Sequence, residues 1–279
     1  MGPEAAGSAE KPMFFYGWVI VAIGFITLGA AFGVWYSFSV FILAIINDFG
    51  WSRAAASSIF SIFIISQSIM NLVTGHLQDR YGPRMVIPLG ALVVALSLWL
   101  TGFSQNLWHF SIAYGVLAGA GISLLGYASH AAFIPRWFER KRGLATGIAM
   151  SGIGFGMLLI IPLVESAIVR FGWRFSYMLL GAMVLLVVGP LNAVFARKRP
   201  QDMNLLPDGD TNDKTSLQRP HRMQLQIVDA KWAAESWTLA KALRTYRFWC
   251  LTLAFFFMAF AYQGIMLHGI SAIDRKSVV

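Results

Sequence analysis

Long runs without a charged residue dominate this sequence. No Asp, Glu, Lys or Arg occurs from Pro12 to Asn47, from Ala54 to Gln78, or from Met85 to Pro135. A soluble fold has too much surface to leave such runs uncharged. Of the 279 residues, 57% are hydrophobic and 13% are charged, whereas ordinary globular domains have roughly 25% charged residues. We therefore expect an all-α integral membrane protein with several spans.

Seven apolar stretches are long enough to cross a bilayer, which takes about 20 residues. Helices are expected because open strands leave backbone groups unsatisfied in lipid, and these stretches lack the alternation of barrel strands. The predicted spans lie at or within Phe15–Ile46, Ala54–His76, Met85–Phe103, Trp108–Phe133, Gly143–Val169, Phe175–Phe195 and Phe248–Ile270.

A hydrophilic segment divides these spans into six and one. Residues 196–245 contain Pro200, Pro207 and Pro220 and mixed charges, which predicts a flexible cytoplasmic linker. We expect a six-helix bundle over residues 1–195, this linker, and the first helix of a second transmembrane half over residues 246–279. The sequence "SWTLAKALRTYRFW", which begins near Trp237, predicts a short surface helix before the last span.

Basic residues are distributed unequally between the two sets of loops. One set of loops carries nine basic residues and the other carries three. The positive-inside rule therefore places the richer set and the N-terminus on the cytoplasmic side of the plasma membrane. The richer set is Arg80, Arg84, Arg136, Arg140, Lys141, Arg142, Arg197, Lys198 and Arg199, and the poorer set is Arg53, Arg170 and Arg174.

The remaining composition excludes several classes of function. Most of the net charge of +9 lies in these loops, so topology explains it and nucleic-acid binding is not expected. A single cysteine, Cys250, excludes a disulfide framework and a cysteine-based metal site. The five histidines form no metal-ligand pair at a spacing of three or four, and no nucleophile with a base is apparent. We expect no metal, no cofactor and no enzymatic activity.

Small residues recur at a spacing of four in three spans. This spacing places each trio on one helix face, where helices can approach closely. Recurrence in spans one and four, each of which opens a three-helix unit, favours two inverted repeats of a transporter. The trios are Gly29, Gly33 and Ser37, then Gly115, Gly119 and Ser123, then Gly143, Gly147 and Ser151.

A tight turn is predicted between spans two and three, in "GHLQDRYGPR". Gly82 supplies the turn with the proline after it, while Asp79 and Arg80 lie at a helix end, where they can pair with neighbouring helices or their dipoles. The segment resembles the signature of the major facilitator superfamily, G-x-L-x-D-R-x-G-x-R. The matching residues are Gly75, Leu77, Asp79, Arg80, Gly82 and Arg84.

Further motifs resemble the monocarboxylate and oxalate/formate antiporter-like branch of that superfamily. They are "YGWV", "GVWYSFSVF", "LRTYRFW" and "RWFERKRGLATGIAMSGIGFG", which begins at Arg136 and includes Arg142. The resemblance extends to about His268, so we expect a chain truncated after the first half plus one helix. In that branch, cationic side chains of the second half pair with the substrate carboxylate.

The resemblance implies a secondary transporter of small organic anions, such as monocarboxylates or dicarboxylates, with protons or a counter-anion as coupling partners. It implies a cytoplasmic gate made of the signature residues with Arg136 and Arg142. We expect the substrate pathway to be lined by Trp35, Tyr36, Gln67, Asn71, Tyr127 and His130.

Two of these expectations have structural alternatives. The polar residues of span two, Ser66, Gln67, Asn71 and Thr74, form either a cavity wall or a hydrogen-bonded seam between helices. His130 is either a proton relay or a buried, hydrogen-bonded histidine. Among ionisable residues near a span end, Glu165 is expected to reach the interface or to pair with Arg170 or Arg174.

Two other functions remain as alternatives. One is a major facilitator transporter of a different small solute. The other is a non-transporting, seven-helix, receptor-like protein, but the charge count places the N-terminus on the wrong side for it. That class also includes light-driven pumps, and the last span has no lysine for a retinal Schiff base.

Overall fold

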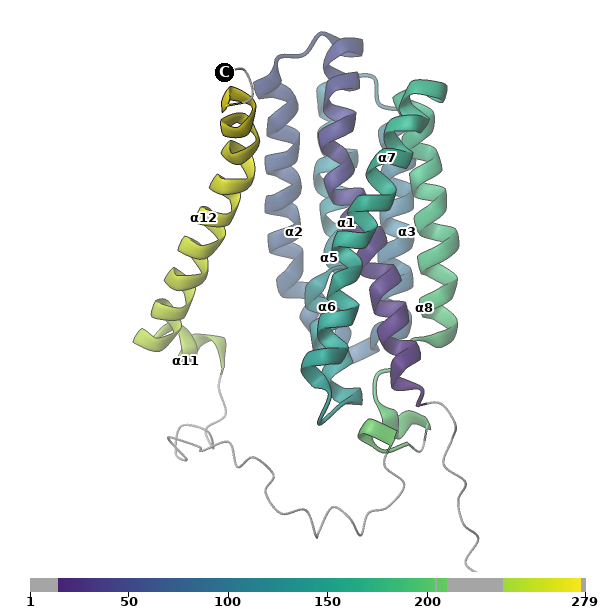
Figure 1. The fold of residues 1–279 in the computed structure, drawn as a ribbon, viewed down its shortest axis with the longest axis vertical. Coiled ribbons are helices and arrows are strands. Elements are labelled where there is room, and N and C mark those ends of the chain that lie inside the picture. The colour runs from purple at the N-terminus through teal and green to yellow at the C-terminus, as the bar shows by residue number, and fades with distance from the viewer. Residues whose placement is uncertain (1–14, 204, 210–237, 277–279) are drawn as a thin grey trace, which may run out of the picture. The chain divides into compact units, whose positions relative to one another are not determined.

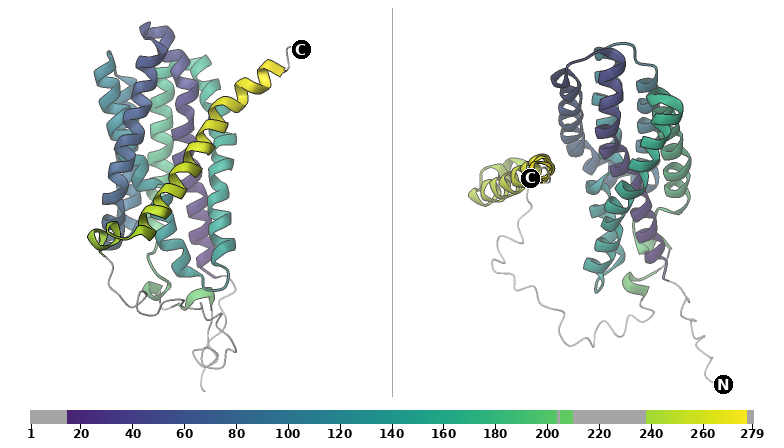
Figure 2. Two further views of the ribbon diagram at one scale, coloured as in Figure 1. Left: turned by 90° about the vertical axis from the view of Figure 1, so that its left-hand side faces the viewer. Right: turned by 45° about the horizontal axis from the view of Figure 1, so that its top comes forward.

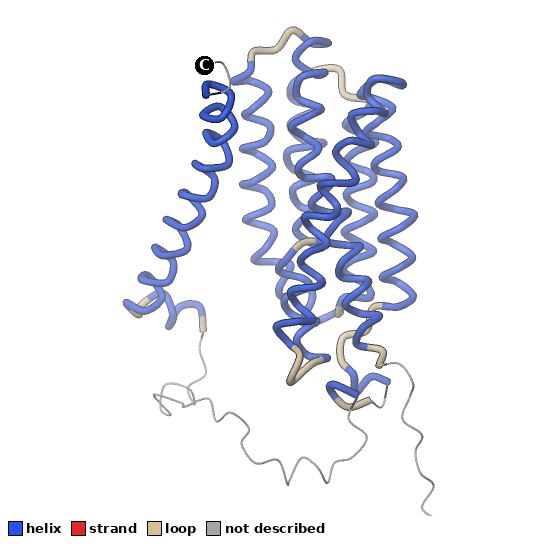
Figure 3. Tube along the Cα trace, viewed as in Figure 1, coloured by secondary structure: helices blue, strands red, loops and turns tan. Residues whose placement is uncertain are grey.

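The computed structural model describes residues 15–203, 205–209 and 238–276. Helices and the loops between them account for these residues, and none of them lies in a strand (Figure 3). The all-α prediction is therefore confirmed for these residues, and five of the helical stretches are long and apolar enough to cross a membrane. The chain divides into two compact units, Met1–Lys214 and Thr215–Val279, and we describe each by itself.

The first unit is a bundle of long helices that run side by side (Figures 1 and 2). Its elements are α1 (Gly17–Phe49), α2 (Arg53–Tyr81), α3 (Pro83–Gly102), α4 (Leu107–Phe110), η1 (Ser111–Ala118), α5 (Gly119–Leu125), α6 (Tyr127–Trp137), α7 (Arg142–Met183), η2 (Val184–Val188), α8 (Gly189–Phe195), η3 (Pro200–Met203) and η4 (Pro207–Gly209). Here η1 and η2 are π-helical, and η3 and η4 are 3₁₀ turns.

The first six predicted spans correspond to five helical stretches in the described residues. Three of them, α1, α2 and α3, each carry one span, and the stretch Leu107–Trp137 carries the fourth with a break at Gly126. The fifth and sixth spans share the 54-residue stretch Arg142–Phe195. Gly172 interrupts it with φ 80° and ψ 162°, values that are not helical, and the chain turns back there (Figure 1). Glycine adopts a positive φ without steric cost, so it can make this reversal without a loop.

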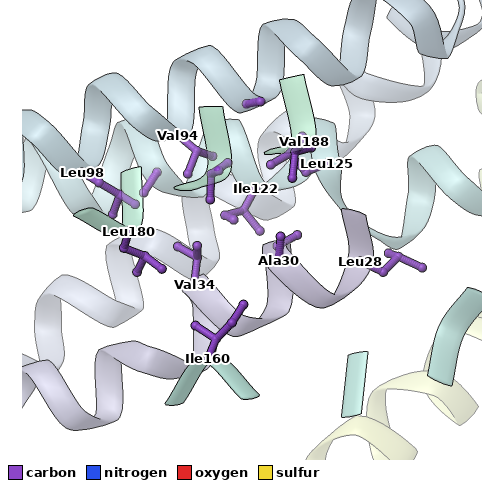
Figure 4. Close-up of a cluster of buried hydrophobic side chains, with 14 of the residues drawn as sticks. Leu28, Ala30, Val34, Val94, Leu98, Ile122, Leu125, Ile160, Leu180 and Val188 are labelled. Carbon is purple, nitrogen blue, oxygen red and sulfur yellow. The ribbon is translucent and has the colours of Figure 1, made fainter. Parts of the chain in front are cut away.

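Buried apolar side chains from every side fill the centre of the bundle. Because lipid tails are as apolar as leucine, close packing rather than exclusion of water holds such helices together. Figure 4 shows part of this core, with Leu28, Ala30, Val34, Val94, Leu98, Ile122, Leu125, Ile160, Leu180 and Val188 labelled.

Helices α1 and α7 make the tightest backbone contact of those described here. A β-carbon added to Gly152 or Gly156 would collide with backbone atoms of Phe25 or Gly29 on α1. The predicted close packing is correct for the first trio, whose Gly29 would meet the carbonyl oxygen of Gly152 at 2.9 Å.

The second trio is also packed as predicted. A β-carbon on Gly115 would meet Ile62 of α2 at 2.9 Å, and one on Gly119 would meet the backbone oxygen of Phe63 at 2.5 Å. The prediction of close helix packing is wrong for the third trio, because an added β-carbon at Gly143 or Gly147 would have open space around it in the described residues. The packed glycines of α7 lie on another face, since each residue turns the helix by about 100°.

The start of the predicted linker folds against the first unit. The indole Nε1 of Trp137 donates to the carbonyl of Arg197 at 3.3 Å, and Pro200 is buried. These contacts explain why the segment up to Gly209 forms two 3₁₀ turns instead of leaving the bundle directly. Residues 210–237 of the predicted linker, including Trp237, lie outside the described residues.

The second unit contains α11 (Leu239–Leu243) and α12 (Tyr246–Lys276). The short surface helix predicted before span seven corresponds to α11, whose first turn is capped by the hydroxyl of Thr238 accepting from the amide of Lys241 at 3.4 Å. The indole of Trp249 donates to the carbonyl of Leu243 at 2.9 Å, which ties the two helices together. The predicted seventh span lies within α12.

Candidate gate and substrate face

The basic loops meet at one end of the first unit, which we call the basic end. It comprises the α2–α3 turn, the α6–α7 loop and the segment after α8, and it lies at the bottom of Figure 1. The six spans of this unit alternate in direction. The first, third and fifth spans begin at this end, and the second, fourth and sixth finish there, which brings the three loops together.

An ion pair joins two helices at this end. Arg136 in the last turn of α6 approaches Asp79 in the last turn of α2, with Nη2 and Oδ1 3.3 Å apart. The Asp79 side chain is 74% exposed and that of Arg136 is 34% exposed. The ammonium of Lys198 donates to the Asp79 backbone carbonyl. Exposed pairs of this kind stabilise a fold by about 0–1 kcal/mol, so the pair can open and close at little cost.

The turn beside this pair requires glycine. Gly82 has φ +75°, a conformation that side-chain-bearing residues rarely adopt, and its amide donates to the carbonyl of Gln78 at 3.0 Å. Pro83 then begins α3, where its missing amide proton costs nothing. This local chemistry sets the direction in which the chain passes from α2 into α3, directly after the turn of helix that carries Asp79.

The other predicted gate residues have different contacts. Arg84 donates from Nε to the carbonyl of Ala193 at 2.8 Å, and Arg142 donates from Nε to that of Phe138 at 2.7 Å. Both arginines therefore hold backbone at the basic end. Arg80 lies over the ring of its neighbour Tyr81, and a β-carbon on Gly75 would have open space within the described residues. Within the described residues, Arg136 is thus the one predicted gate residue that contacts the Asp79 side chain.

Polar residues of α2 form a hydrogen-bonded seam with α5 and η1. The hydroxyl of Ser123 donates to Asn71 Oδ1 at 2.7 Å and lies 2.8 Å from that of Thr74. Ser66 donates to the carbonyl of Val116 at 2.7 Å, and Gln67 is buried nearby. The seam alternative is confirmed for these contacts. Asn71 remains exposed as well, so one residue can serve both the seam and a cavity wall.

The aromatic candidates lie on α1 in a stacked row. The ring of Trp35 is 5.3 Å from that of Phe32 and 6.0 Å from that of Tyr36, and it meets Phe63 of α2 edge-on at 5.5 Å. Trp35 and Tyr36 are half-buried. Stacking fixes the ring planes and therefore the direction of the Tyr36 hydroxyl.

The two candidates on α6 differ in exposure. Tyr127 is exposed at the start of the helix, directly after the break at Gly126. His130 is fully buried, with Nδ1 3.0 Å from the carbonyl of Gly126, and Nε2 has no partner among the described residues. The structural alternative for His130, a buried and hydrogen-bonded histidine, is thus observed in this conformation.

The opposite end of the unit has an ion pair that we did not predict. Asp48 at the end of α1 accepts from Arg174 Nη1 at 2.6 Å and from the indole of Trp173 at 3.1 Å. Glu165 was expected to reach the interface or to pair with Arg170 or Arg174, and the structure pairs Arg174 with Asp48 instead. The sequence does place Asp48 and Arg174 in loops on the same predicted side of the membrane. Because the two residues are far apart in the chain, the sequence alone does not pair them.

Comparison with known proteins identifies the family of the chain. The profile of the Major Facilitator Superfamily matches residues 23–274, which is most of the chain. The chain belongs to the Major Facilitator Superfamily. It is a multi-pass membrane protein with part of that fold, as the signature in α2 and the α2–α3 turn predicts.

Its relatives include named monocarboxylate transporters. It is 32% identical to Monocarboxylate transporter 13 of Bos taurus over 180 residues, which are 64% of this chain and 42% of the relative. It is 29% identical to Monocarboxylate transporter 12 of Rattus norvegicus over 248 residues, 88% of this chain and 48% of the relative. It is 34% identical to the uncharacterized MFS-type transporter YcxA of Bacillus subtilis over 164 residues, 59% of this chain and 40% of the relative.

The chain spans less than half the length of each of these three relatives. All three carry transporter names, in line with the expectation that this protein is not an enzyme.

Proposed function

We propose that this chain supplies the first half of a secondary transporter of small organic anions that works by alternating access. The similarity to monocarboxylate transporters supports the substrate class. The observation that carries the mechanism is the Asp79–Arg136 pair, which joins α2 to α6 at one end of the bundle. A weak pair at a helix end suits a gate that must break in every transport cycle.

Substrate contact is assigned to a different part of the same helices. Gln67 precedes Asp79 by 12 residues in α2, which corresponds to about 18 Å along the axis. We assign Tyr36, Asn71 and Tyr127, with Gln67 and Trp35 around them, to the substrate pathway. Hydroxyl and amide groups can donate to a carboxylate, whereas Asp79 would repel it.

The remaining parts of the proposal follow from the same arrangement. The basic end faces the cytoplasm, because positively charged loops are retained there. Arg84 and Arg142 stabilise the backbone beside the gate by donating hydrogen bonds to the carbonyls of Ala193 and Phe138, respectively. His130, which is buried three residues after Tyr127 in α6, is assigned to the wall of the pathway, and water reaches it only when α6 moves. The coupling partner is a proton or a counter-anion.

Uptake measurements test this proposal. In a chimera, residues 1–245 of this chain are joined to the second six-helix half of a monocarboxylate transporter, which replaces α12, and the product is reconstituted into liposomes. We expect saturable uptake of a labelled monocarboxylate that unlabelled monocarboxylates inhibit and that neutral analogues of equal size do not. Uptake of the neutral analogue with no effect of the acid would contradict the assigned substrate class and would favour a different solute.

A further inference from the structure

The basic end contains a cavity that the transport proposal does not use. Its volume is about 580 Å³, within the range of small-molecule sites. It lies between the α6–α7 loop and the segment after α8, and it is lined by Arg136, Glu139, Arg142, Arg199, Gln201 and Pro207. We propose that this cavity binds a phosphate-bearing anion of headgroup size.

The charge of the lining residues favours an anion. Three of them, Arg136, Arg142 and Arg199, carry guanidinium groups, and Glu139 carries the one carboxylate, which leaves a formal charge of +2. A guanidinium has five N–H donors, and the contacts described above use one each on Arg136 and Arg142. The side chain of Arg199 is exposed at the cavity. Three guanidinium groups therefore lie on the lining of one space.

A buried carboxylate holds the two walls of the cavity together. Asp208 Oδ2 accepts from the backbone amides of Glu139 at 2.9 Å and Arg140 at 2.8 Å. Its side chain is only 7% exposed, and its backbone has φ +60°, which is unfavourable for a residue other than glycine. The fold keeps this strained residue where it fastens η4 to the α6–α7 loop. The cavity is thus built by specific contacts and does not depend on chance proximity of two loops.

The geometry of the donors suits phosphate. One guanidinium group can donate two parallel hydrogen bonds to two oxygens of the same phosphate. A phosphate also offers more acceptor oxygens than a carboxylate does. A phosphate monoester carries a charge of about −1.5 to −2 at pH 7, and the phosphodiester of an anionic lipid carries a single negative charge, so the positive lining attracts both. Anionic headgroups also gather at the cytoplasmic surface of membranes, where basic juxtamembrane residues attract them. A lipid headgroup and a soluble phosphate share this chemistry.

Occupancy of this cavity acts on the gate, because Arg136 belongs to both. Its guanidinium lines the cavity and also approaches Asp79. An anion that draws Arg136 toward the cavity weakens the pair between α2 and α6. This part rests on the proposed function: with the basic end at the cytoplasmic surface, the site connects the composition of that surface to the ease of gate opening.

Ligand-induced stabilisation tests the proposal on the purified 279-residue chain in an uncharged detergent. Thermal unfolding is followed by tryptophan fluorescence while ligand is titrated. The probes are dihexanoyl-phosphatidylglycerol, sodium phosphate at constant ionic strength, and dihexanoyl-phosphatidylcholine as the control for acyl chains. We expect a saturable rise in Tm with one or both of the anionic probes and a smaller one with phosphatidylcholine. Response to the lipid alone identifies a headgroup site, and response to inorganic phosphate identifies a soluble ligand.

Matched variants locate the binding site. Arg199→Gln should weaken the apparent affinity roughly tenfold or more, because it removes charge-assisted bonds from an exposed lining residue. Gln201→Glu, which adds a negative charge to the lining, should weaken it as well. Arg170→Gln, the same change beside the reversal at Gly172 and at the opposite end of the first unit, should leave it unaltered. The proposal is overturned if neither anion raises Tm, if phosphatidylcholine acts as strongly as phosphatidylglycerol, or if Arg199→Gln and Gln201→Glu bind as Arg170→Gln does.

Discussion

The close contact between α1 and α7 can be tested by adding a single methyl group to one of its glycines. A methyl group at position 156 would collide with the backbone of Gly29, and backbone atoms cannot rotate away as a flexible side chain can. Overpacking a tight contact costs about 1–3 kcal/mol. We place Gly156→Ala near the upper part of that range, since the two helices must separate to accommodate the methyl group.

A glycine two residues away provides the matched control. An added β-carbon at Gly154 has open space within the described residues. Alanine there removes no packing and favours the helix by up to about 1 kcal/mol. The same chemical change on the same helix therefore has opposite expected effects, and the two variants should differ by about 2 kcal/mol or more.

The free energy of unfolding of both variants is measured in mixed micelles by titration with a denaturing detergent, with tryptophan fluorescence as the signal. Gly156→Ala should unfold at clearly lower denaturant than the unmodified protein, and Gly154→Ala should not. Equal stability of the two variants would refute the close approach of α1 and α7, and with it the packing order of the bundle.

Three further predictions concern other contacts of the first unit. Asp48→Asn should reduce the free energy of unfolding by about 1 kcal/mol in the same assay, because it weakens an exposed but hydrogen-bonded pair with Arg174; no loss would mean that the pair does not form. Asn192→Ala should cost about 0.6–1.7 kcal/mol, since its Nδ2 donates to Thr27 Oγ1 at 2.8 Å between buried helix faces; an unchanged value would contradict that bond. Asp202→Cys, in a cysteine-free background, should resist an impermeant maleimide in intact cells and react after permeabilisation, and labelling from outside would reverse the proposed orientation.

Composition and signature residues were sufficient to predict the spans and the basic end. Charge-free runs require lipid around them, and the turn at Gly82 needs glycine, so both features can be recognised locally. The sequence of α7 was less informative. Its small residues fall on more than one face, and only the position of α1 decides that Gly152 and Gly156, and not Gly143 and Gly147, are packed.

Contacts between distant residues escaped prediction for a related reason. The pairs of Asp48 with Arg174 and of Asp208 with the α6–α7 loop each join segments that are far apart in the chain. Periodicity describes one helix at a time and carries no information on such partners. The seam of Asn71, Thr74 and Ser123 was expected only as one of two alternatives, because a polar helix face suits a neighbouring helix and a cavity equally well.

The division between gate and substrate pathway is the central claim, and paired binding and uptake measurements test it most directly. Asp79→Asn, Gln67→Ala and Tyr127→Phe are prepared in the chimera with a second six-helix half. Asp79→Asn should slow uptake strongly and leave the substrate Kd within a few-fold. The other two should weaken binding, because a hydrogen bond to a charged group contributes about 1.5–3 kcal/mol, or roughly 10-fold to 150-fold in Kd. Loss of binding in Asp79→Asn together with normal binding in both other variants would contradict the account.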